Sequence, residues 1–283
     1  MSIPTDGTPL DGLLYEPPEV PAIGCVLLMH GNGMNFYVGP PRFLPPYLVA
    51  RGFACLAYNR RGHDILSTRN SRRAEGNAFQ TIAEAVADNR CAAAWLAERG
   101  HPPPAVVGHS HGGMLAVRHV ADHPQTPALV LLSAHRGGDF VAVASRHGLL
   151  AGDRLEELKA RARSLVAAGR GDALMLLPGW WYAISAASLL DLSDNAPDIL
   201  ELAPRIACPT LYVRGAEEPK ALYPAEAFGE RAAGPVDVRV LAHCDHFYNG
   251  VEAALGELVT GWLAETVAGV TPARRRRRRS SGP

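Results

Sequence analysis

The chain has 283 residues, of which 47% are hydrophobic and 20% charged, as in an ordinary globular protein with a sizeable core. Its formal net charge of zero is misleading, because six of the 28 basic residues are the consecutive arginines 274–279. The rest of the chain carries 22 basic against 28 acidic residues, a net charge of −6, which disfavours a nucleic-acid-binding surface on the folded body.

Cysteine spacing and the N-terminus narrow the class of protein further. The five cysteines are scattered and include no C-x-x-C pair, which argues against a disulfide framework or a zinc site. The first residues lack the basic and apolar regions of a signal peptide, and no apolar run is as long as a membrane span requires. We therefore expect a cytoplasmic protein with no membrane contact.

The first half of the chain alternates strand-like and helical patterns. Strands are predicted at residues 10–15, 23–29, 53–58, 105–107 and 128–132, the first of them at a sheet edge. Helices are predicted to end near residue 51 and to span residues 78–99 and 112–123. Continuous apolar strands alternating with helices predict a mostly parallel, twisted sheet that carries helices on both faces.

The alternation stops between residues 135 and 205, where helices are predicted near 153–168 and 184–192 and no strand is clear. We interpret 135–205 as a helical cap inserted above the sheet. Strands at 209–214 and 236–241, with helices at 225–233 and 251–267, then complete the fold. The predicted α/β core therefore comprises residues 1–134 and 206–268.

The segment 269–283 contains the six arginines, and such a charge run repels itself, so we expect a disordered basic tail. A solvated tail is the favoured interpretation. The alternative is a tether for an anionic partner, since clustered arginines bind phosphates and other anions.

The most informative motif is Gly108-His109-Ser110-His111-Gly112, which follows an apolar strand and precedes a helical pattern. Gly-x-Ser-x-Gly at a strand-to-helix turn is the nucleophile elbow of serine hydrolases, and its glycines relieve the crowding of a sharp turn. A serine hydroxyl also needs a base, usually a histidine that a carboxylate orients. Loops after two later strands offer these groups, with Glu217 and Glu218 in one and His243, Asp245 and His246 in the other.

Together these features resemble the α/β-hydrolase-fold serine hydrolases, in particular capped esterase- or lipase-like members, over residues 10–267. The family commonly has His-Gly-x after its third strand, which His30-Gly31-Asn32 matches. The next strand is commonly followed by Asp-x-Arg-Gly-x-Gly. Residues 59–64 match this pattern with two departures, Asn59 for Asp and Asp64 for the second Gly, which bear on the shape of the substrate loop.

The resemblance implies Ser110 as nucleophile, His246 as base and Glu218 as acid, in the order that this fold requires. Glu217 is an alternative acid because it is one residue away. Asp139, after the strand at 128–132, is another, because some relatives place the acid there. The resemblance also implies an oxyanion hole formed by the backbone amides of Asn32 and His111.

Aromatic residues suggest the substrate pocket. Trp180, Trp181 and Tyr182 from the cap, with Phe36 and Tyr37 from the oxyanion loop, are candidates to line it, and Gly31 lets the loop approach the substrate. The alternative is that these aromatics only pack the cap onto the core.

The sequence thus predicts a cofactor-independent, metal-free hydrolase that cleaves a carboxylic ester of a small or medium apolar substrate through an acyl-enzyme intermediate. The same triad would serve a thioesterase, an amidase or a C–C bond hydrolase. From another class, a non-catalytic ligand-binding protein could keep the fold. The expected partner is a small molecule, and the sequence leaves open whether the chain is a monomer or a homodimer.

Overall fold

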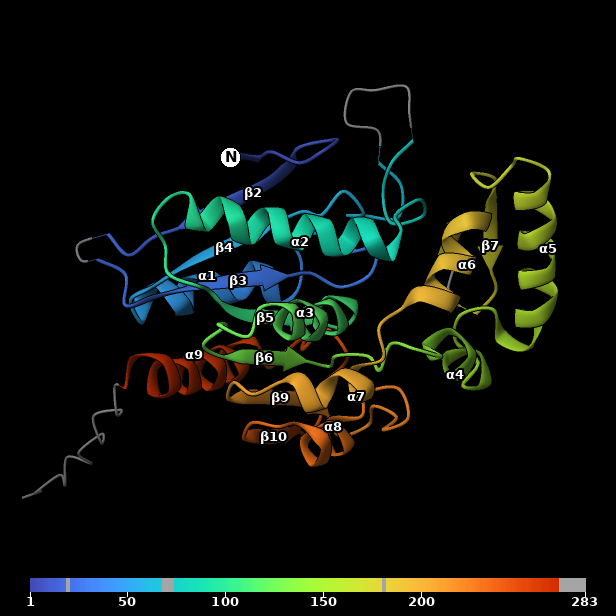
Figure 1. Ribbon diagram of the computed structural model, residues 1–283. Coiled ribbons are helices and arrows are strands. Elements are labelled where there is room, and N and C mark those ends of the chain that lie inside the picture. Colours follow the sequence, from blue (N-terminus) through green and yellow to red (C-terminus); the bar gives the residue numbers. More distant parts are fainter. Residues whose placement is uncertain (19–20, 68–73, 180–181, 270–283) are drawn as a thin grey trace, which may run out of the picture.

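A twisted eight-stranded sheet runs through the centre of the computed structural model, which describes residues 1–18, 21–67, 74–179 and 182–269 (Figure 1). The strand order is β1-β2-β4-β3-β5-β6-β9-β10. Among the described strands of this sheet, the pairs β1–β2 and β2–β4 are antiparallel and the other pairs are parallel. The strands are β1 (Ser2–Ile3), β2 (Leu10–Tyr15), β3 (Gly24–Met29), β4 (Phe53–Tyr58), β5 (Ala105–His109), β6 (Leu129–Leu132), β9 (Thr210–Gly215) and β10 (Val236–Leu241). The mostly parallel α/β architecture predicted from the sequence is confirmed.

The central strands are apolar throughout because both faces of the sheet are covered. Every residue of β3 and β4 is buried, and the two strands pair in parallel from Gly24 opposite Phe53 to Leu28 opposite Ala57. A strand that shows no alternation of polar and apolar residues is typical of a sheet with helices on both sides. The chain therefore has two apolar layers, one on each face.

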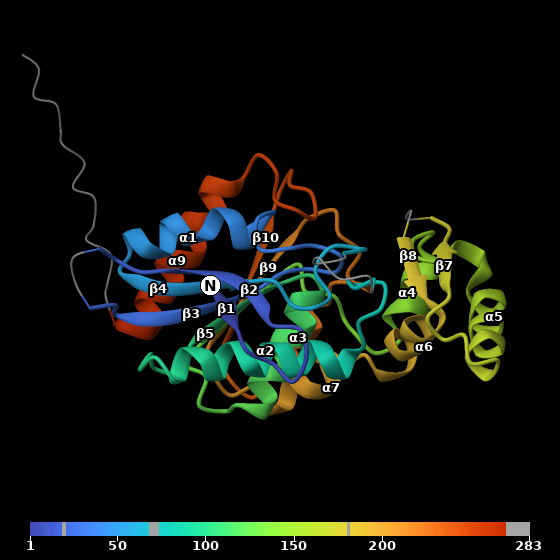
Figure 2. The same ribbon diagram turned by 90° about the horizontal axis from the view of Figure 1, so that it is seen from above.

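Four helices form most of these layers (Figure 2). Helices α1 (Pro40–Ala50) and α9 (Glu252–Ala268) lie together on one face, where Leu44, Leu255 and Val259 are fully buried. Helices α2 (Ile82–Ala97) and α3 (His111–Asp122) cover the other face. Burying one leucine or valine side chain in this way stabilises the fold by about 1.5–3 kcal/mol.

Helix α2 begins later than the sequence pattern predicts. The Thr81 side chain accepts a hydrogen bond from the Glu84 amide, and the Glu84 side chain accepts one from the Thr81 amide. This reciprocal capping box satisfies two amides that the first helical turn leaves free, and so fixes the start at Ile82. The predicted helix at 78–99 is therefore four residues too long at its start.

The segment between β6 and β9 forms a lobe beyond the carboxyl ends of the parallel strands (Figures 1 and 2). We use "the lobe" for its described residues between 140 and 195. Its elements are α4 (Phe140–Arg146), η1 (Gly152–Arg154), α5 (Leu155–Ala167), β7 (Leu174–Leu177), β8 (Tyr182–Ser185) and α6 (Ala186–Asn195). After the lobe, α7 (Ile199–Leu202) and η2 (Ala203–Arg205) pack beside α3 and α8 (Ala225–Arg231).

The lobe differs from the purely helical insertion that the sequence predicts. Strands β7 and β8 form an antiparallel pair, from Leu174 opposite Ser185 to Leu177 opposite Tyr182. Met175 and Leu177 are buried whereas Leu176 is 74% exposed, so β7 alternates between a packed and a free face. The predicted helix at 184–192 instead starts at Ala186, where the Ser185 side chain caps it.

The remaining features concern the cysteines and the helix lengths. All five cysteines are free thiols, with Cys25, Cys55 and Cys244 buried. Within the described ranges, every helix is too short or too polar to cross a membrane. The basic tail predicted at 269–283 lies outside the described residues beyond Gly269.

Candidate active site

Ser110 occupies the sharp turn between β5 and α3. Its backbone has φ 55° and ψ −119°, in a region that residues other than glycine rarely adopt. A Cβ on Gly108 would lie 2.4 Å from the Gly112 carbonyl oxygen, and one on Gly112 would lie 2.4 Å from the His30 carbonyl oxygen. The two glycines are therefore required by close backbone contact, and they hold a serine in a strained, almost buried position.

His246 joins Ser110 to Glu218 across two loops that follow neighbouring strands. Its Nε2 lies 3.0 Å from Ser110 Oγ, and its Nδ1 lies 2.7 Å from Glu218 Oε1. A carboxylate only accepts hydrogen bonds, so Nδ1 carries the proton and Nε2 is left to accept the serine hydroxyl. The structure thus brings Ser110, His246 and Glu218 into one hydrogen-bonded chain.

The second oxygen of Glu218 is held as firmly as the first. Its Oε2 accepts hydrogen bonds from the Gly215 amide at 2.8 Å and from the Ser133 hydroxyl at 2.7 Å. The buried Tyr248 hydroxyl lies 2.7 Å from Ser133 Oγ. Burial, and next the charge of Glu218, raise the pKa of Tyr248 well above its ordinary value, so it stays a neutral phenol. Ser133 and Tyr248 were not predicted, although Ser133 directly follows an apolar strand.

The competing candidates lie elsewhere. Glu217 is exposed, and Asp139 forms an ion pair with Arg136 at 3.0 Å. His243 is exposed as well. Asp245 accepts hydrogen bonds from the Phe247 and Asn249 amides, and it thereby shapes the loop that carries His246.

Two backbone amides belong to residues that line the same cavity as Ser110. Within the described part of the chain, the amides of Asn32 and His111 have no hydrogen-bond partner. His111 is the first residue of α3, where amide groups are free and the helix dipole is positive. Beside Asn32, a Cβ on Gly31 would lie 2.7 Å from Met34 Sδ and 3.3 Å from His109 Nδ1, so a larger residue here would have to displace the Met34 side chain.

The buried His30 side chain holds this loop in place through hydrogen bonds. Its ring donates to the Gly31 carbonyl at 2.8 Å and accepts from the Arg60 amide at 3.1 Å. Burial and then the neighbouring Arg60 lower the pKa of His30 well below its ordinary value, so the ring is neutral. A neutral ring can make both hydrogen bonds at once.

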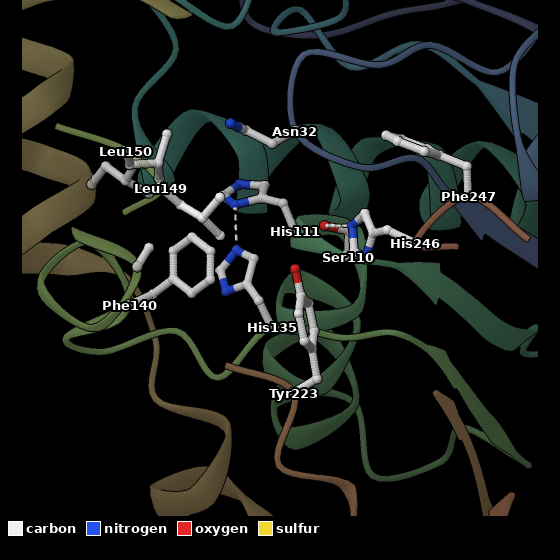
Figure 3. Close-up of a pocket in the computed structure, with 12 residues that line it drawn as sticks. Asn32, Ser110, His111, His135, Phe140, Leu149, Leu150, Tyr223, His246 and Phe247 are labelled. Carbon is white, nitrogen blue, oxygen red and sulfur yellow. Dashed lines mark hydrogen bonds between the residues drawn. The ribbon is translucent and has the colours of Figure 1, made fainter. Parts of the chain in front are cut away.

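A cavity of about 190 Å³ opens beside Ser110, between the sheet and the lobe (Figure 3). Its apolar wall comes from the lobe: Phe140, Ala144, Leu149, Leu150 and Leu192. Its polar lining is Asn32, Ser110, His111, His135, Tyr223 and His246. A second cavity of about 420 Å³ also borders Ser110 and is lined by Gly33, Met34, Ile65 and Tyr182. Phe247 borders both.

Only part of the predicted aromatic lining faces these cavities. Tyr182 lines the larger one, and its hydroxyl accepts a hydrogen bond from the Asn77 side chain. Phe36 instead packs onto the apolar layer of α1 and α9, and Tyr37 is 48% exposed. Trp180 and Trp181 lie outside the described residues.

The two residues that depart from the family loop accept hydrogen bonds from the segment that carries Phe36 and Tyr37. Asn59 Oδ1 accepts from the Phe36 amide at 2.9 Å, and Asp64 Oδ1 accepts from the Asn35 side chain at 2.7 Å. These bonds tie the loop back onto residues 59–64.

Among the described residues, no cluster of three or more histidine, cysteine or acidic side chains has the arrangement of a metal site. The polar groups beside Ser110 instead form hydrogen bonds with one another.

The structure resembles several solved esterases and hydrolases. Est1E from Butyrivibrio proteoclasticus, with ferulic acid bound, has a TM-score of 0.73 and is 18% identical, over 95% of this chain and 99% of that one. A thermostable carboxyl esterase from Bacillus coagulans, in complex with glycerol, has a TM-score of 0.71 and is 14% identical, over 94% and 98%. A dienelactone hydrolase from Anabaena variabilis ATCC 29413 has a TM-score of 0.59 and is 18% identical, over 94% and 96%.

At these identities the likeness concerns the fold alone. No curated protein matches the sequence. A model of the alpha/beta hydrolase family, however, matches residues 26–259, which is most of the chain and includes Ser110, Glu218 and His246. The chain belongs to the alpha/beta hydrolase family.

Proposed function

We propose that the protein is a serine hydrolase that cleaves a carboxylic ester of a small or medium apolar substrate. The observation that carries this proposal is the chain of contacts from Ser110 Oγ to His246 Nε2 at 3.0 Å and from His246 Nδ1 to Glu218 Oε1 at 2.7 Å. A serine becomes nucleophilic when an oriented histidine takes its proton, and this geometry meets that requirement.

In the first step, Ser110 Oγ attacks the ester carbonyl while His246 Nε2 takes the hydroxyl proton. His246 then gives this proton to the departing alcohol, which leaves an acyl group on Ser110. Water repeats the sequence on the acyl-enzyme and releases the acid. Glu218 keeps the His246 proton on Nδ1 and stabilises the charged ring that forms in each step.

The unpaired amides of Asn32 and His111 are the donors for the negative oxygen of the tetrahedral intermediate. Fixed donors of this kind lower the barrier because they need no reorientation when the charge develops. Loss of one such donor typically costs about 2.7–4 kcal/mol of transition-state stabilisation.

The two cavities suggest where the two parts of an ester bind. Ser110, His246, Asn32 and Phe247 border both cavities, so an ester whose carbonyl lies at Ser110 can place one group in each. The lobe supplies the apolar wall of the smaller cavity, which favours an apolar acyl group there. We assign the cap role to residues 135–205, which would select the substrate and exclude water.

The names of the similar structures support ester cleavage as the leading choice, since two of them are esterases. Related bond types remain as alternatives because one triad serves several reactions. A panel of p-nitrophenyl esters, thioesters and anilides against wild type and Ser110→Ala separates them. We expect the wild type to turn over the esters. We expect Ser110→Ala to lower this turnover by roughly 10⁴-fold or more.

If thioesters or anilides are turned over faster than esters, the bond class in the proposal is wrong, but Ser110 remains the nucleophile. If wild type turns over none of the panel, the non-catalytic binding protein becomes the better account. Equal turnover by wild type and Ser110→Ala would contradict the proposed site.

A further inference from the structure

Two buried histidines form part of the wall of the smaller cavity, and the catalytic proposal uses neither ring. His111 follows the nucleophile at the start of α3, and His135 follows β6. They are 4% and 3% exposed, and His111 Nδ1 lies 3.1 Å from His135 Nε2 (Figure 3).

The hydrogen bonds of the pair fix which nitrogen carries each proton. The Gly137 amide donates to His135 Nδ1 at 3.0 Å, so in a neutral ring the proton of His135 is on Nε2. That N–H donates to His111 Nδ1, which leaves the proton of His111 on Nε2. Both rings are neutral at physiological pH, since burial above all lowers the pKa of His135 to about 3 and that of His111 well below its ordinary value.

The resulting N–H of His111 has nothing to bind within the described residues. Its Nε2 has no hydrogen-bond partner there. This nitrogen is also not one of the side-chain polar atoms that are fully buried without a partner. Figure 3 shows this nitrogen turned away from His135. It is therefore a donor of fixed direction on a ring that lines the cavity.

The other polar groups of this wall have different tasks. Ser110 and His246 bind one another, and both nitrogens of His135 are used. The Asn32 side chain hydrogen-bonds to the Tyr182 hydroxyl. Tyr223 lies next to His246, with ring centroids 5.1 Å apart and ring planes tilted by 43°, on the side of the cavity close to the reacting atoms.

We propose that the smaller cavity binds acyl groups that carry an uncharged acceptor oxygen, such as a ketone or an ether, along an otherwise apolar chain, and that His111 Nε2 donates a hydrogen bond to it. The inference rests on the proposed function, because it places the acyl part of the ester in this cavity. His111 is then a specificity-determining residue and His135 a positioning residue that holds its proton on Nε2.

The charge of the wall explains why the acceptor is uncharged. None of the described residues lining the cavity is a cation; the Arg60 guanidinium, 1% exposed, is bound to the His30 carbonyl at 2.8 Å behind the loop. A carboxylate would lose its water here without gaining an ion pair. A plain alkyl chain would leave the His111 donor without a partner, which is also unfavourable.

The test compares p-nitrophenyl heptanoate with its keto analogues, in which the ketone moves one carbon at a time along the acyl chain. We expect one keto position to raise kcat/KM about tenfold over heptanoate in the wild type. The mono-p-nitrophenyl ester of heptanedioic acid, which ends in a carboxylate, should react more slowly than heptanoate. This arm needs no variant, so a folding defect cannot obscure it.

Two variants assign the preference to the donor. His111→Leu removes the N–H and should reduce the keto-to-alkyl ratio to about one, whereas His111→Gln offers an amide N–H near the same place and should retain part of the ratio. Because each ratio compares two esters on one protein, any general loss of activity cancels.

The inference is overturned if no keto position is preferred, if the carboxylate ester reacts faster than the keto ester, or if His111→Leu keeps the full ratio. Each of these results can occur while hydrolysis still depends on Ser110, so the proposed function would stand. Hydrolysis that Ser110→Ala retains would instead refute the proposed function itself.

Discussion

The strand ends and the lobe supply the two sides of the same cavity by different physical means. At the strand ends the groups of the proposed triad are held by short contacts, as in the 2.7 Å bond from His246 to Glu218 and the 2.8 Å bond from the Gly215 amide to the same carboxylate. The lobe presents only apolar side chains such as Phe140 and Leu149, which are placed by packing.

This contrast separates chemistry from selectivity. Hydrogen bonds are directional, so the strand-end groups keep a geometry that proton transfer requires. Apolar contact is not directional, so the lobe can change its side chains and thereby the substrate without changing the reaction. Changes to the groups that carry the proton transfer should therefore affect every substrate alike, and changes to the wall of the cavity should alter the ranking of substrates.

The largest effect is expected for Glu218→Gln. The amide can present an N–H to His246 and so favour the wrong tautomer, which should lower kcat by roughly 10³–10⁴-fold for all esters. The matched control is Glu217→Gln, an exposed neighbour, which should retain wild-type turnover. If the two variants exchange these results, Glu217 is the acid.

Ser133→Ala should have a smaller effect in the same region. It removes the hydroxyl that lies 2.7 Å from Glu218 Oε2 and leaves the buried carboxylate with one hydrogen bond fewer. A lost bond to a charged group predicts a fall in kcat of about tenfold to a hundredfold, equally for short and long esters. Steady-state kinetics with Ser164→Ala, an exposed serine of α5, as control would measure it. An unchanged kcat would show that Ser133 does not support the acid.

Leu149→Ala tests the lobe. Loss of this wall should change kcat/KM for medium-length acyl esters by about tenfold relative to the acetate ester, whose short chain does not reach it. The control is Leu176→Ala, which removes a leucine of the same lobe that is 74% exposed on β7. Equal losses for all chain lengths would mean that Leu149 supports the fold and not the substrate.

The smallest effect concerns the free energy of unfolding. It tests His119, a buried histidine that does not line the cavity. Burial lowers the pKa of His119, on α3, from 6.5 to about 4. The unfolded chain therefore binds a proton more readily than the folded protein, and stability falls as the pH drops from 6.5 towards 4. His119→Leu should remove up to about 1.4 kcal/mol per pH unit from this slope. Urea unfolding across the window measures it, and an unchanged slope would show that His119 does not contribute.

The sequence predicts that the groups of the strand-end site come together because each of them follows a predicted strand within a few residues. In a parallel sheet the carboxyl ends of neighbouring strands meet, so Ser110, Glu218 and His246 had to come close once the strands were recognised. Ser133 and Tyr248 escaped prediction because their role depends on side-chain contacts between loops that no local pattern encodes.

The structure of the lobe is harder to predict from the sequence for a related reason. A short apolar run such as 174–177 has too few residues to distinguish a strand from a helix, so the β7–β8 pair was missed. Phe36 and Tyr37 illustrate a second limit, since their loop donates hydrogen bonds to Asn59 and Asp64, contacts that no local sequence pattern encodes. The polar wall formed by His111 and His135 likewise becomes visible only when α3 and the loop after β6 are placed side by side.

The central claim is that Ser110 is an activated nucleophile, and labelling with a fluorophosphonate tests it most directly. Intact-mass spectrometry at neutral pH should show one adduct per chain, peptide mapping should place it on Ser110, and Ser110→Ala should remain unlabelled. A folded wild-type protein that gains no adduct, or gains it at another residue, would contradict the account.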